Sequence, residues 1–284
     1  KSIYTKNLTV SDQNRLSVII DFEYKKEKNM QQISSVNNAT IKKLAKLKQK
    51  KYRDDEGLYL IEGFHLFEEA LKAGKKYQYI LGTEEALDQA DSEYEVDLSG
   101  KNVVLINKAI ARHLSSTKNS QEIFMVLKID QPKEFPFNYG KWVLLDNLAD
   151  PGNVGTIIRT ADAAGFDGVV LSPESADLYN PKTQRAMQGS QFHIDLIKRD
   201  LANVITDFQD AAIPVYASLL DRSAKQLPDF EKVPQLALII GNEAHGISKT
   251  IASLADEKLY IPIKGQAESL NAAVAAGIMI YHFA

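Results

Sequence analysis

Short apolar runs and helix-like segments alternate through the second half of the chain, and this alternation restricts the fold more than any other feature. The apolar runs lie at 142–148, 168–172, 214–220, 236–242 and 258–263. Helices are expected at 153–164, 181–189, 200–210, 246–255 and 269–283. Runs of this kind suit strands that are buried on both faces, so the pattern predicts an α/β fold with a parallel sheet covered by helices. Ligands of such sheets bind beyond the carboxyl ends of the strands.

The first half predicts a second, smaller α/β domain. A helix over 41–53 can be capped by Asn38 or Thr40, and strands are expected at 57–63, 77–83 and 123–129, with a helix from 64 that ends at Gly74. We expect this domain to span 31–131, with a proline-containing linker at 132–140 and the second domain at 141–284. Residues 1–30 are expected to be an N-terminal extension, in which Met30 is a plausible natural start.

Composition excludes several classes of protein. The chain has no cysteine, which excludes disulfides, thiolate catalysis and cysteine metal sites and fits a cytoplasmic protein. We find no apolar run of membrane-spanning length and no signal peptide pattern. The five histidines show no ligand spacing, so no metal is expected.

A basic stretch is hidden in a net charge of −3. Residues 40–53 contain no acid, and the candidate nucleic-acid contacts in this stretch are Lys42, Lys43, Lys46, Lys50 and Arg53. A solvated helix face is the commoner fate of such a run. The position of this stretch ahead of the motifs described next favours nucleic acid.

The first motif follows a strand end and runs through Pro151 and Gly152 into a helix that contains Asn153 and Arg159. Asn153 alone would be explained as a helix cap, and Arg159 as a solvated arginine or a salt-bridge partner. The functional alternative is a fixed guanidinium at the edge of a ligand site, where it binds phosphate or perturbs a nearby hydroxyl group.

The second motif ends a buried strand with Gly241, Asn242 and Glu243, followed by Gly246. Ile247 stands where a phosphate-binding loop would have lysine, and no G-x-G-x-x-G sequence marks a dinucleotide site. The glycines alone would be turn positions with positive φ, and Glu243 alone would be a charge favoured by a helix dipole.

The third motif places polar residues in front of a small-residue helix. Pro262 ends a strand, Gly265 allows a loop to approach a ligand closely, and Glu268, Ser269 and Asn271 precede a run of alanines. Ser269 is expected to cap the last helix. A well-capped core or dimer helix explains the alanines but not the polar cluster, which we interpret as part of a cofactor pocket.

Together these motifs resemble the SpoU, or TrmH-like, branch of the SPOUT RNA methyltransferases. The resemblance covers about 140–284 and rests on Asn153, Gly155 and Arg159, on 241–248, and on 261–276; the segment 179–194 is also similar to the family. The first half resembles the L30e-like domain that binds substrate in such enzymes. The resemblance implies a trefoil-knotted α/β domain, bound S-adenosylmethionine, a homodimer and methylation of a ribose 2′-hydroxyl in RNA.

The resemblance also implies roles for single residues. Arg159 would activate the 2′-hydroxyl, while Asn153, Glu243, Ser269 and Asn271 would orient Arg159 and the target nucleotide. The cofactor pocket would be lined by Gly241, Asn242, Ile261, Ile263 and Leu270, with Ser218 a further candidate. Arg185 is a candidate RNA contact, and a structural arginine is an equal alternative.

Three other functions remain open at this point. They are a ribosome-assembly factor without activity, a methyltransferase with a base nitrogen as acceptor, and an unrelated nucleotide-binding hydrolase. Among RNA substrates, 23S ribosomal RNA is favoured because the first half resembles the corresponding domain of 23S enzymes, and transfer RNA is the alternative.

Overall fold

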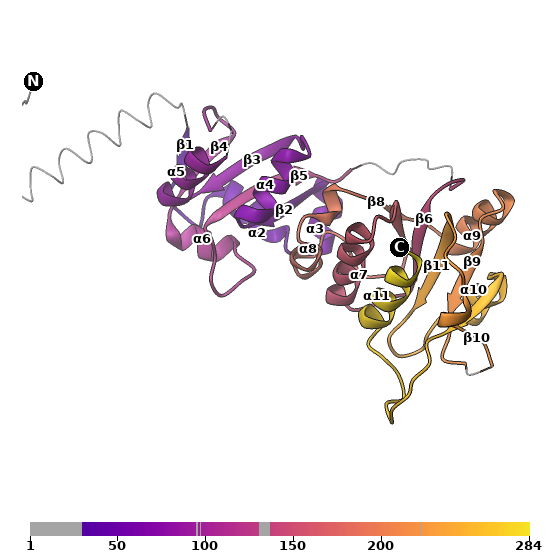
Figure 1. Cartoon of the computed structure of the whole chain (residues 1–284). Coiled ribbons are helices and arrows are strands. Elements are labelled where there is room, and N and C mark those ends of the chain that lie inside the picture. The colour runs from indigo at the N-terminus through magenta and orange to yellow at the C-terminus, as the bar shows by residue number, and fades with distance from the viewer. Residues whose placement is uncertain (1–29, 95, 97, 131–136, 222) are drawn as a thin grey trace, which may run out of the picture.

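The computed structural model describes residues 30–284 apart from 95, 97, 131–136 and 222. The expected extension at 1–30 therefore lies outside the described residues except for Met30, and so does most of the expected linker. The chain forms two domains, each built on its own sheet (Figure 1). We call them the N-terminal domain, up to Asp130, and the C-terminal domain, from Phe137.

The sheet of the N-terminal domain has the strand order β1-β4-β3-β5-β2. Its strands are β1 (Gln31–Ile33), β2 (Leu58–Glu62), β3 (Tyr77–Gly82), β4 (Val103–Ile106) and β5 (Ile123–Lys128). Strand β5 runs antiparallel to β2 and β3, whereas β1, β4 and β3 are parallel. The small α/β domain expected from the sequence is thus present, and its sheet is mixed.

Helices cover both faces of this first sheet. One face packs against α4 (Phe64–Lys72) and α5 (Glu84–Glu93), and the other against α2 (Ala39–Lys46) and α6 (Lys108–Leu114). The single helix expected over 41–53 is wrong, because the chain breaks after Leu47 and restarts as α3 (Lys50–Glu56). Asn38 caps α2 by accepting from the amides of Thr40 and Ile41.

The sheet of the C-terminal domain is entirely parallel, as expected, in the order β10-β12-β9-β11-β6-β7-β8. Its strands are β6 (Lys141–Asp146), β7 (Gly168–Leu171), β8 (Asp195–Lys198), β9 (Val215–Ser218), β10 (Lys225–Gln226), β11 (Leu236–Gly241) and β12 (Glu257–Tyr260). The short strands β8 and β10 are the two that the apolar runs did not predict.

Alternation along these strands divides the C-terminal core into two layers. Val143 and Leu145 of β6 face α7 (Pro151–Ala163) and α11 (Ala272–Phe283). Trp142 and Leu144 face α9 (Leu201–Asp210) and α10 (Lys249–Leu254). Successive strand residues point to opposite faces, so an uninterrupted apolar run is what a sheet covered on both sides requires.

Phe137 anchors the entry to the C-terminal domain. Its side chain is fully buried and packs against Trp142 and Phe208, with ring centroids 5.4 and 5.3 Å away. The end of the expected linker therefore belongs to the packed core of the C-terminal domain.

Helix α8 (Pro181–Met187) lies where the two domains meet (Figure 1). It packs against α7, and Gly155 makes this approach possible, since a Cβ at this position would lie 2.5 Å from the Cβ of Ala186 and 2.8 Å from the carbonyl oxygen of Thr183. Gly155 of the first motif is thus explained by helix packing.

No helix in the described ranges has both the length and the apolar character needed to cross a bilayer.

Candidate functional site

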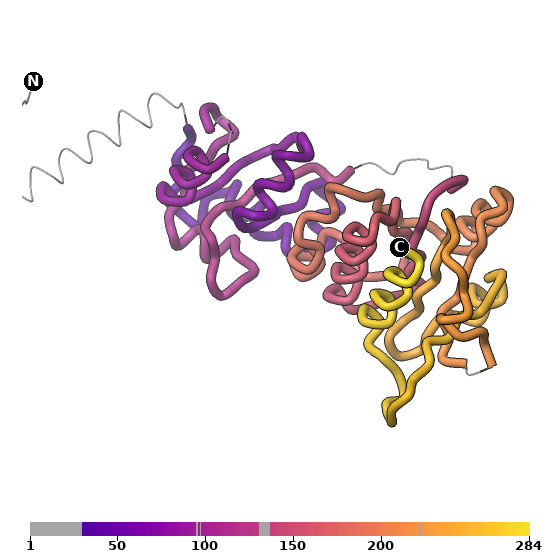
Figure 2. Tube along the Cα trace, viewed as in Figure 1, coloured from indigo at the N-terminus to yellow at the C-terminus, as the bar shows by residue number. Residues whose placement is uncertain are grey.

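The carboxyl ends of β9, β11 and β6 lie side by side and place the first two motifs at one edge of the sheet. Gly241 at the end of β11 is in register with Asp146 at the end of β6. Ser218 closes the neighbouring strand β9. From this edge the chain projects as the loop 261–271 before it turns back into α11 (Figure 2).

One hydrogen-bonded chain joins the three motifs. The side-chain amide of Asn153 donates to Oε1 of Glu243 at 2.9 Å, and the side-chain amide of Asn271 donates to Oδ1 of Asn153 at 3.1 Å. We call Asn153, Glu243 and Asn271 the motif network. Residues 90 and 118 positions apart in the sequence therefore meet at the start of α7.

Glu243 is the acceptor at the centre of this edge. Besides Asn153, it accepts from the backbone amides of Ala149 at 3.2 Å and Asp150 at 3.1 Å. Partial burial acts to raise the pKa of Glu243, but these hydrogen bonds outweigh it and hold the pKa below its ordinary value. Glu243 is therefore an ionised acceptor that fixes the turn before α7. A charge at a helix N-terminus explains only part of this arrangement.

The helix caps differ from the sequence expectation. Asn271, rather than Ser269, caps α11 by accepting from the amides of Ala273 and Val274. The N-cap of α7 is Asp150, which accepts from the amide of Asn153 at 2.9 Å. Asn153 is thus free of capping, and its side chain is used entirely within the motif network.

Arg159 and Ser269 lie outside the motif network. Arg159 is exposed on α7, about 9 Å along the helix axis from Asn153 at the usual rise per residue. Within the described residues, neither side chain has a hydrogen-bond or ion-pair partner. An exposed guanidinium without a carboxylate partner keeps all of its donors for a ligand.

Three of the expected cofactor residues lie on the loop 261–271, and Gly241 and Ser218 end the strands β11 and β9. Ile261 and Ile263 are partly exposed, and Leu270 keeps 36% of its surface accessible. In the described part of the chain the backbone amides of 263–270 make no hydrogen bond. Apolar side chains beside unused backbone donors suit an adenosine group, which needs flat apolar contacts and a few hydrogen bonds to its edges.

The glycines of the second motif serve two purposes. A Cβ at Gly241 would lie 2.2 Å from the carbonyl carbon of Gly246, so no side chain fits there, and only Gly246 has a positive φ, of 69°. Asn242 fixes the turn by donating to the carbonyl oxygen of Asn147 at 2.7 Å and by accepting from the amides of Ala244 and His245. The alternative in which both glycines are turn positions with positive φ therefore holds for Gly246 and not for Gly241.

Sequence reasoning missed Asp146 and Asp150. Asp146 is buried and accepts from the amide of Ser248 at 2.7 Å, which ties the second motif to β6. Asp150 pairs with Lys182 of α8 at 2.7 Å while it caps α7. The sequence Asp-Pro at a helix start was an available signal for the cap, because aspartate is favoured at the N-cap and proline at the next position.

The basic stretch is less uniform than its sequence suggests. Arg53 is only 2% exposed; its guanidinium pairs with Asp177 and donates to the carbonyl oxygen of Leu47 at 2.6 Å. The proposed RNA contact by Arg53 is therefore wrong, because its donors face the protein interior.

The acidic residues that follow the basic stretch pair with two of its lysines. Lys43 binds Glu56 at 2.6 Å and Lys50 binds Asp54. Lys42 and Lys46 are exposed and have no acidic partner among the described residues, and the ammonium of Lys46 lies 5.1 Å from the ring centroid of Tyr52.

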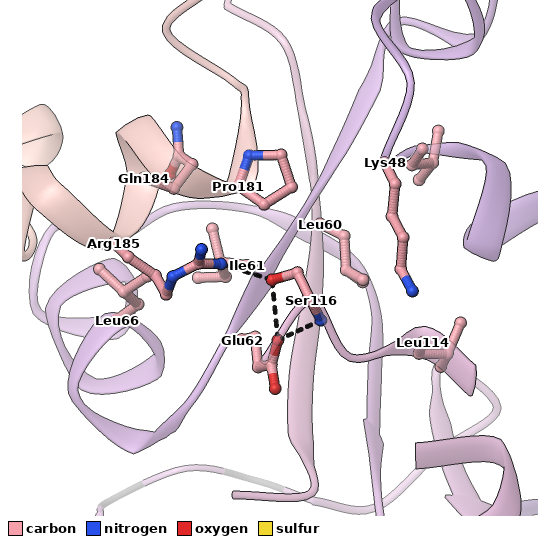
Figure 3. Close-up of a pocket in the computed structure, with 11 residues that line it drawn as sticks. Lys48, Leu60, Ile61, Glu62, Leu66, Leu114, Ser116, Pro181, Gln184 and Arg185 are labelled. Carbon is pink, nitrogen blue, oxygen red and sulfur yellow. Dashed lines mark hydrogen bonds between the residues drawn. The ribbon is translucent and has the colours of Figure 1, made fainter. Parts of the chain in front are cut away.

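Arg185 reaches across a crevice between the domains. Its Nη1 donates to the hydroxyl of Ser116 at 2.6 Å, and that hydroxyl donates to Glu62 at 3.2 Å (Figure 3). On the other side of the crevice, Lys48 donates to the carbonyl oxygen of Ser115 at 2.7 Å. Arg185 thus makes a structural hydrogen bond between the domains.

Family comparison agrees with this architecture. Residues 141–281 match the SpoU rRNA Methylase family, and residues 38–125 match the MRM3-like substrate binding domain. The chain is 39% identical over 256 residues to the 23S rRNA (guanosine(2553)-2′-O)-methyltransferase RlmP of Bacillus subtilis, covering 89% of this chain and 99% of that protein. It is 31% identical over 254 residues to an uncharacterized tRNA/rRNA methyltransferase of Synechocystis, covering 88% and 92%.

Solved structures show the same fold over both domains. An AdoMet-bound rRNA methyltransferase from Sinorhizobium meliloti superposes with a TM-score of 0.78 at 30% identity, covering 89% of this chain and 97% of that one. The SpoU methyltransferase AviRb from Streptomyces viridochromogenes, in complex with AdoMet, gives 0.76 at 25% identity, covering 87% and 97%. The expected family and α/β fold are confirmed: the chain belongs to the SpoU rRNA methylase family of RNA 2′-O-methyltransferases.

Proposed function

We propose that this enzyme transfers a methyl group from S-adenosylmethionine to a ribose 2′-hydroxyl of ribosomal RNA, with 23S RNA as the first candidate. The observation that carries the proposal is the motif network, which unites three separate sequence motifs beside a loop suited to adenosine. The name of the Bacillus subtilis relative supports the choice of 23S RNA.

Gly241, Asn242, Ile261, Ile263 and Leu270 would hold the cofactor, with Ser218 at the adjacent strand end. When bound, the cofactor supplies the methyl group as an electrophilic sulfonium. The trefoil knot expected for this family would bring the loop 261–271 over the edge formed by β11.

The residues of the chain favour the reaction mainly by positioning and charge. With the cofactor bound, its methyl group would pass from sulfur to the ribose 2′-oxygen, and the hydroxyl proton would leave to solvent. A guanidinium has five donors and no acceptor, so the role of Arg159 is to stabilise the developing alkoxide or to bind the adjacent phosphate. Glu243 has a lowered pKa and satisfied oxygens, which makes it an orienting group and a poor base.

RNA binding would begin on the N-terminal domain. Lys42 and Lys46 are the cations of α2 that lack acidic partners in the described structure, and Arg185 offers further donors beside α7. A ribosomal substrate would place the enzyme in the cytoplasm.

A homodimer through the C-terminal domain is supported by one face of α11. Val274, Ile278 and Tyr281 follow each other at helical spacing and keep 52%, 42% and 56% of their surfaces exposed, while the opposite face of α11 packs on α7. An exposed apolar stripe of this kind is typical of a protein interface. Sedimentation of the wild type beside Ile278→Lys tests this assembly: a dimer that becomes a monomer supports it, and an unchanged species contradicts it.

The test of activity is transfer of labelled methyl from S-adenosylmethionine to ribosomal and transfer RNA that lack the modification, with Arg159→Ala as the control. We expect alkali-resistant labelled dinucleotides from ribosomal RNA that disappear with the variant. Label only in transfer RNA would show that the substrate is transfer RNA and not ribosomal RNA. Cofactor binding without label in either RNA would favour the assembly-factor function.

A further inference from the structure

The segment 177–193 belongs to the C-terminal domain in sequence but contacts the N-terminal domain at both of its ends. At the first end, Tyr179 packs on Tyr59 with ring centroids 4.6 Å apart, and Asp177 pairs with the buried Arg53. At the other end, Phe192 packs against the core of the N-terminal domain. We call this segment the coupling segment.

The coupling segment also contacts the helix that carries Asn153 and Arg159. Its helix α8 packs on α7 with the close approach at Gly155 described above. Lys182 adds an ion pair to Asp150, the N-cap of α7. The N-terminal domain and α7 are therefore held by opposite sides of one short segment.

His193 closes this connection directly. Its Nε2 lies 2.8 Å from Oε2 of Glu69 on α4, and its Nδ1 lies 3.0 Å from Oδ2 of Asp162 on α7. Asp162 is three residues, or almost one helical turn, beyond Arg159. One imidazole thus bridges a helix of the N-terminal domain and the helix that carries Arg159.

The chemistry of the bridge requires a charged ring. A neutral imidazole donates at one nitrogen and presents a lone pair at the other, whereas the imidazolium donates at both. Two carboxylates facing the two nitrogens are therefore satisfied together only when His193 is protonated.

The charged groups around the ring also favour the protonated form of His193. The hydrogen bond to Asp162 raises the pKa of His193, partial burial lowers it, and the bond to Glu69 raises it again, so that it lies above the ordinary value. On α4, the ammonium of Lys72 forms ion pairs with Glu69 at 3.1 Å and with Glu68 at 2.8 Å.

We propose that His193 is a positioning residue, which fixes the N-terminal domain against α7 so that RNA held on that domain meets Arg159 in one geometry. The proposal rests on the function proposed above. Because the folded pKa is raised, the bridge is complete below the ordinary histidine pKa of about 6.5 and is lost as pH rises through the raised value.

Steady-state kinetics of RNA methylation between pH 6 and 9 test the proposal, with the wild type, His193→Gln, His193→Arg and the matched control His113→Gln on the exposed surface of α6. At pH 6 we expect His193→Gln to lower kcat/KM for RNA several-fold, without a change in cofactor affinity. This deficit should shrink as pH rises, because the wild type then loses one of the two bonds.

His193→Arg keeps a cation at every pH, so its activity relative to the wild type should increase with pH. His113→Gln should follow the wild type throughout. A ratio of wild type to His193→Gln that is constant with pH, or equal to one, would overturn the proposal.

Domain geometry gives a readout that does not depend on methylation. The chain has no cysteine, so Lys101→Cys in the N-terminal domain and Asp207→Cys on α9 accept a fluorescent pair specifically. We expect the interdomain distance distribution to broaden in His193→Gln, and in the wild type as pH rises. An unchanged distribution would refute the bridge. If the distance distribution broadened but the protein methylated no RNA, the result would support the bridge and contradict the proposed function.

Discussion

The motif network and the lysines of α2 differ in how far their residues depend on one another. Asn153, Glu243 and Asn271 come from distant parts of the chain and share hydrogen bonds, so each depends on the others. Lys42 and Lys46 stand on the exposed face of one helix, and neither has an acidic partner in the described structure. The difference teaches that substitutions at the sheet edge should be large and non-additive, whereas those on α2 should be small and independent.

Arg159 should show the largest effect. We expect Arg159→Ala to lower kcat by about 10²–10³-fold, the loss typical of removing one donor to a developing oxyanion, with little change in the free energy of unfolding. Arg159→Lys separates charge from geometry. Lysine keeps the cation and loses the planar fork, so a variant as weak as alanine would show that bidentate contact matters. Single-turnover rates at saturating RNA measure this, and full activity of Arg159→Ala would contradict its role.

Coupling within the motif network gives the next largest effect. Asn153→Ala and Glu243→Gln should each reduce kcat/KM by about ten- to a hundredfold, in line with a hydrogen bond to a charged group. The double variant should be scarcely worse than the weaker single variant, since Asn153→Ala removes the hydrogen bond that Glu243→Gln weakens. A double-mutant cycle measures the coupling. Losses that multiply would mean that the two residues act separately.

Asn271 combines a cap and a network bond, and a pair of variants separates them. Asn271→Ala removes both and should lower the free energy of unfolding by about 1 kcal/mol. Asn271→Ser can still cap α11 but lacks the side-chain amide that donates to Asn153, so stability should be kept while activity falls several-fold. Thermal unfolding and methylation rates are compared for the two variants. Equal activity of Asn271→Ser and the wild type would mean that the bond to Asn153 is dispensable.

Much of the fold could be predicted because burial leaves an apolar pattern in the sequence. The strands β6, β7, β9, β11 and β12 are apolar runs, since helices cover both faces of their sheet. Helix α5 and strand β8 were missed because the first is mostly polar and the second is only partly buried. A weak apolar pattern carries little information about such elements.

The sequence singled out the three residues of the motif network but not the bonds between them. Three motifs identified Asn153, Glu243 and Asn271, yet which residue caps α7 or α11 depends on backbone geometry at the helix start. Arg53 has the same charge as the lysines around it, and only the fold shows that it is buried and paired with Asp177, 124 positions away. The charge of a residue is known from its own position in the sequence, whereas an ion pair between domains is seen only in the folded structure.

The smallest effects should come from α2. Each of Lys42→Gln and Lys46→Gln should weaken RNA binding only a few-fold and reduce the slope of log K against log salt by about 1, because one phosphate contact is lost. Lys43→Gln is the matched variant on the same helix: Glu56 already neutralises this lysine, so its salt slope should change less. Lys249→Gln on α10, at the other end of the molecule, should change nothing (Figure 1). Filter-binding titrations between low and moderate salt measure these slopes. If Lys43→Gln and Lys42→Gln changed the salt slope equally, the ion pair with Glu56 would have no influence on RNA binding. If the slopes of all four variants matched that of the wild type, α2 would not face RNA. The proposed contrast between a cooperative site and an additive basic helix would then be wrong for α2.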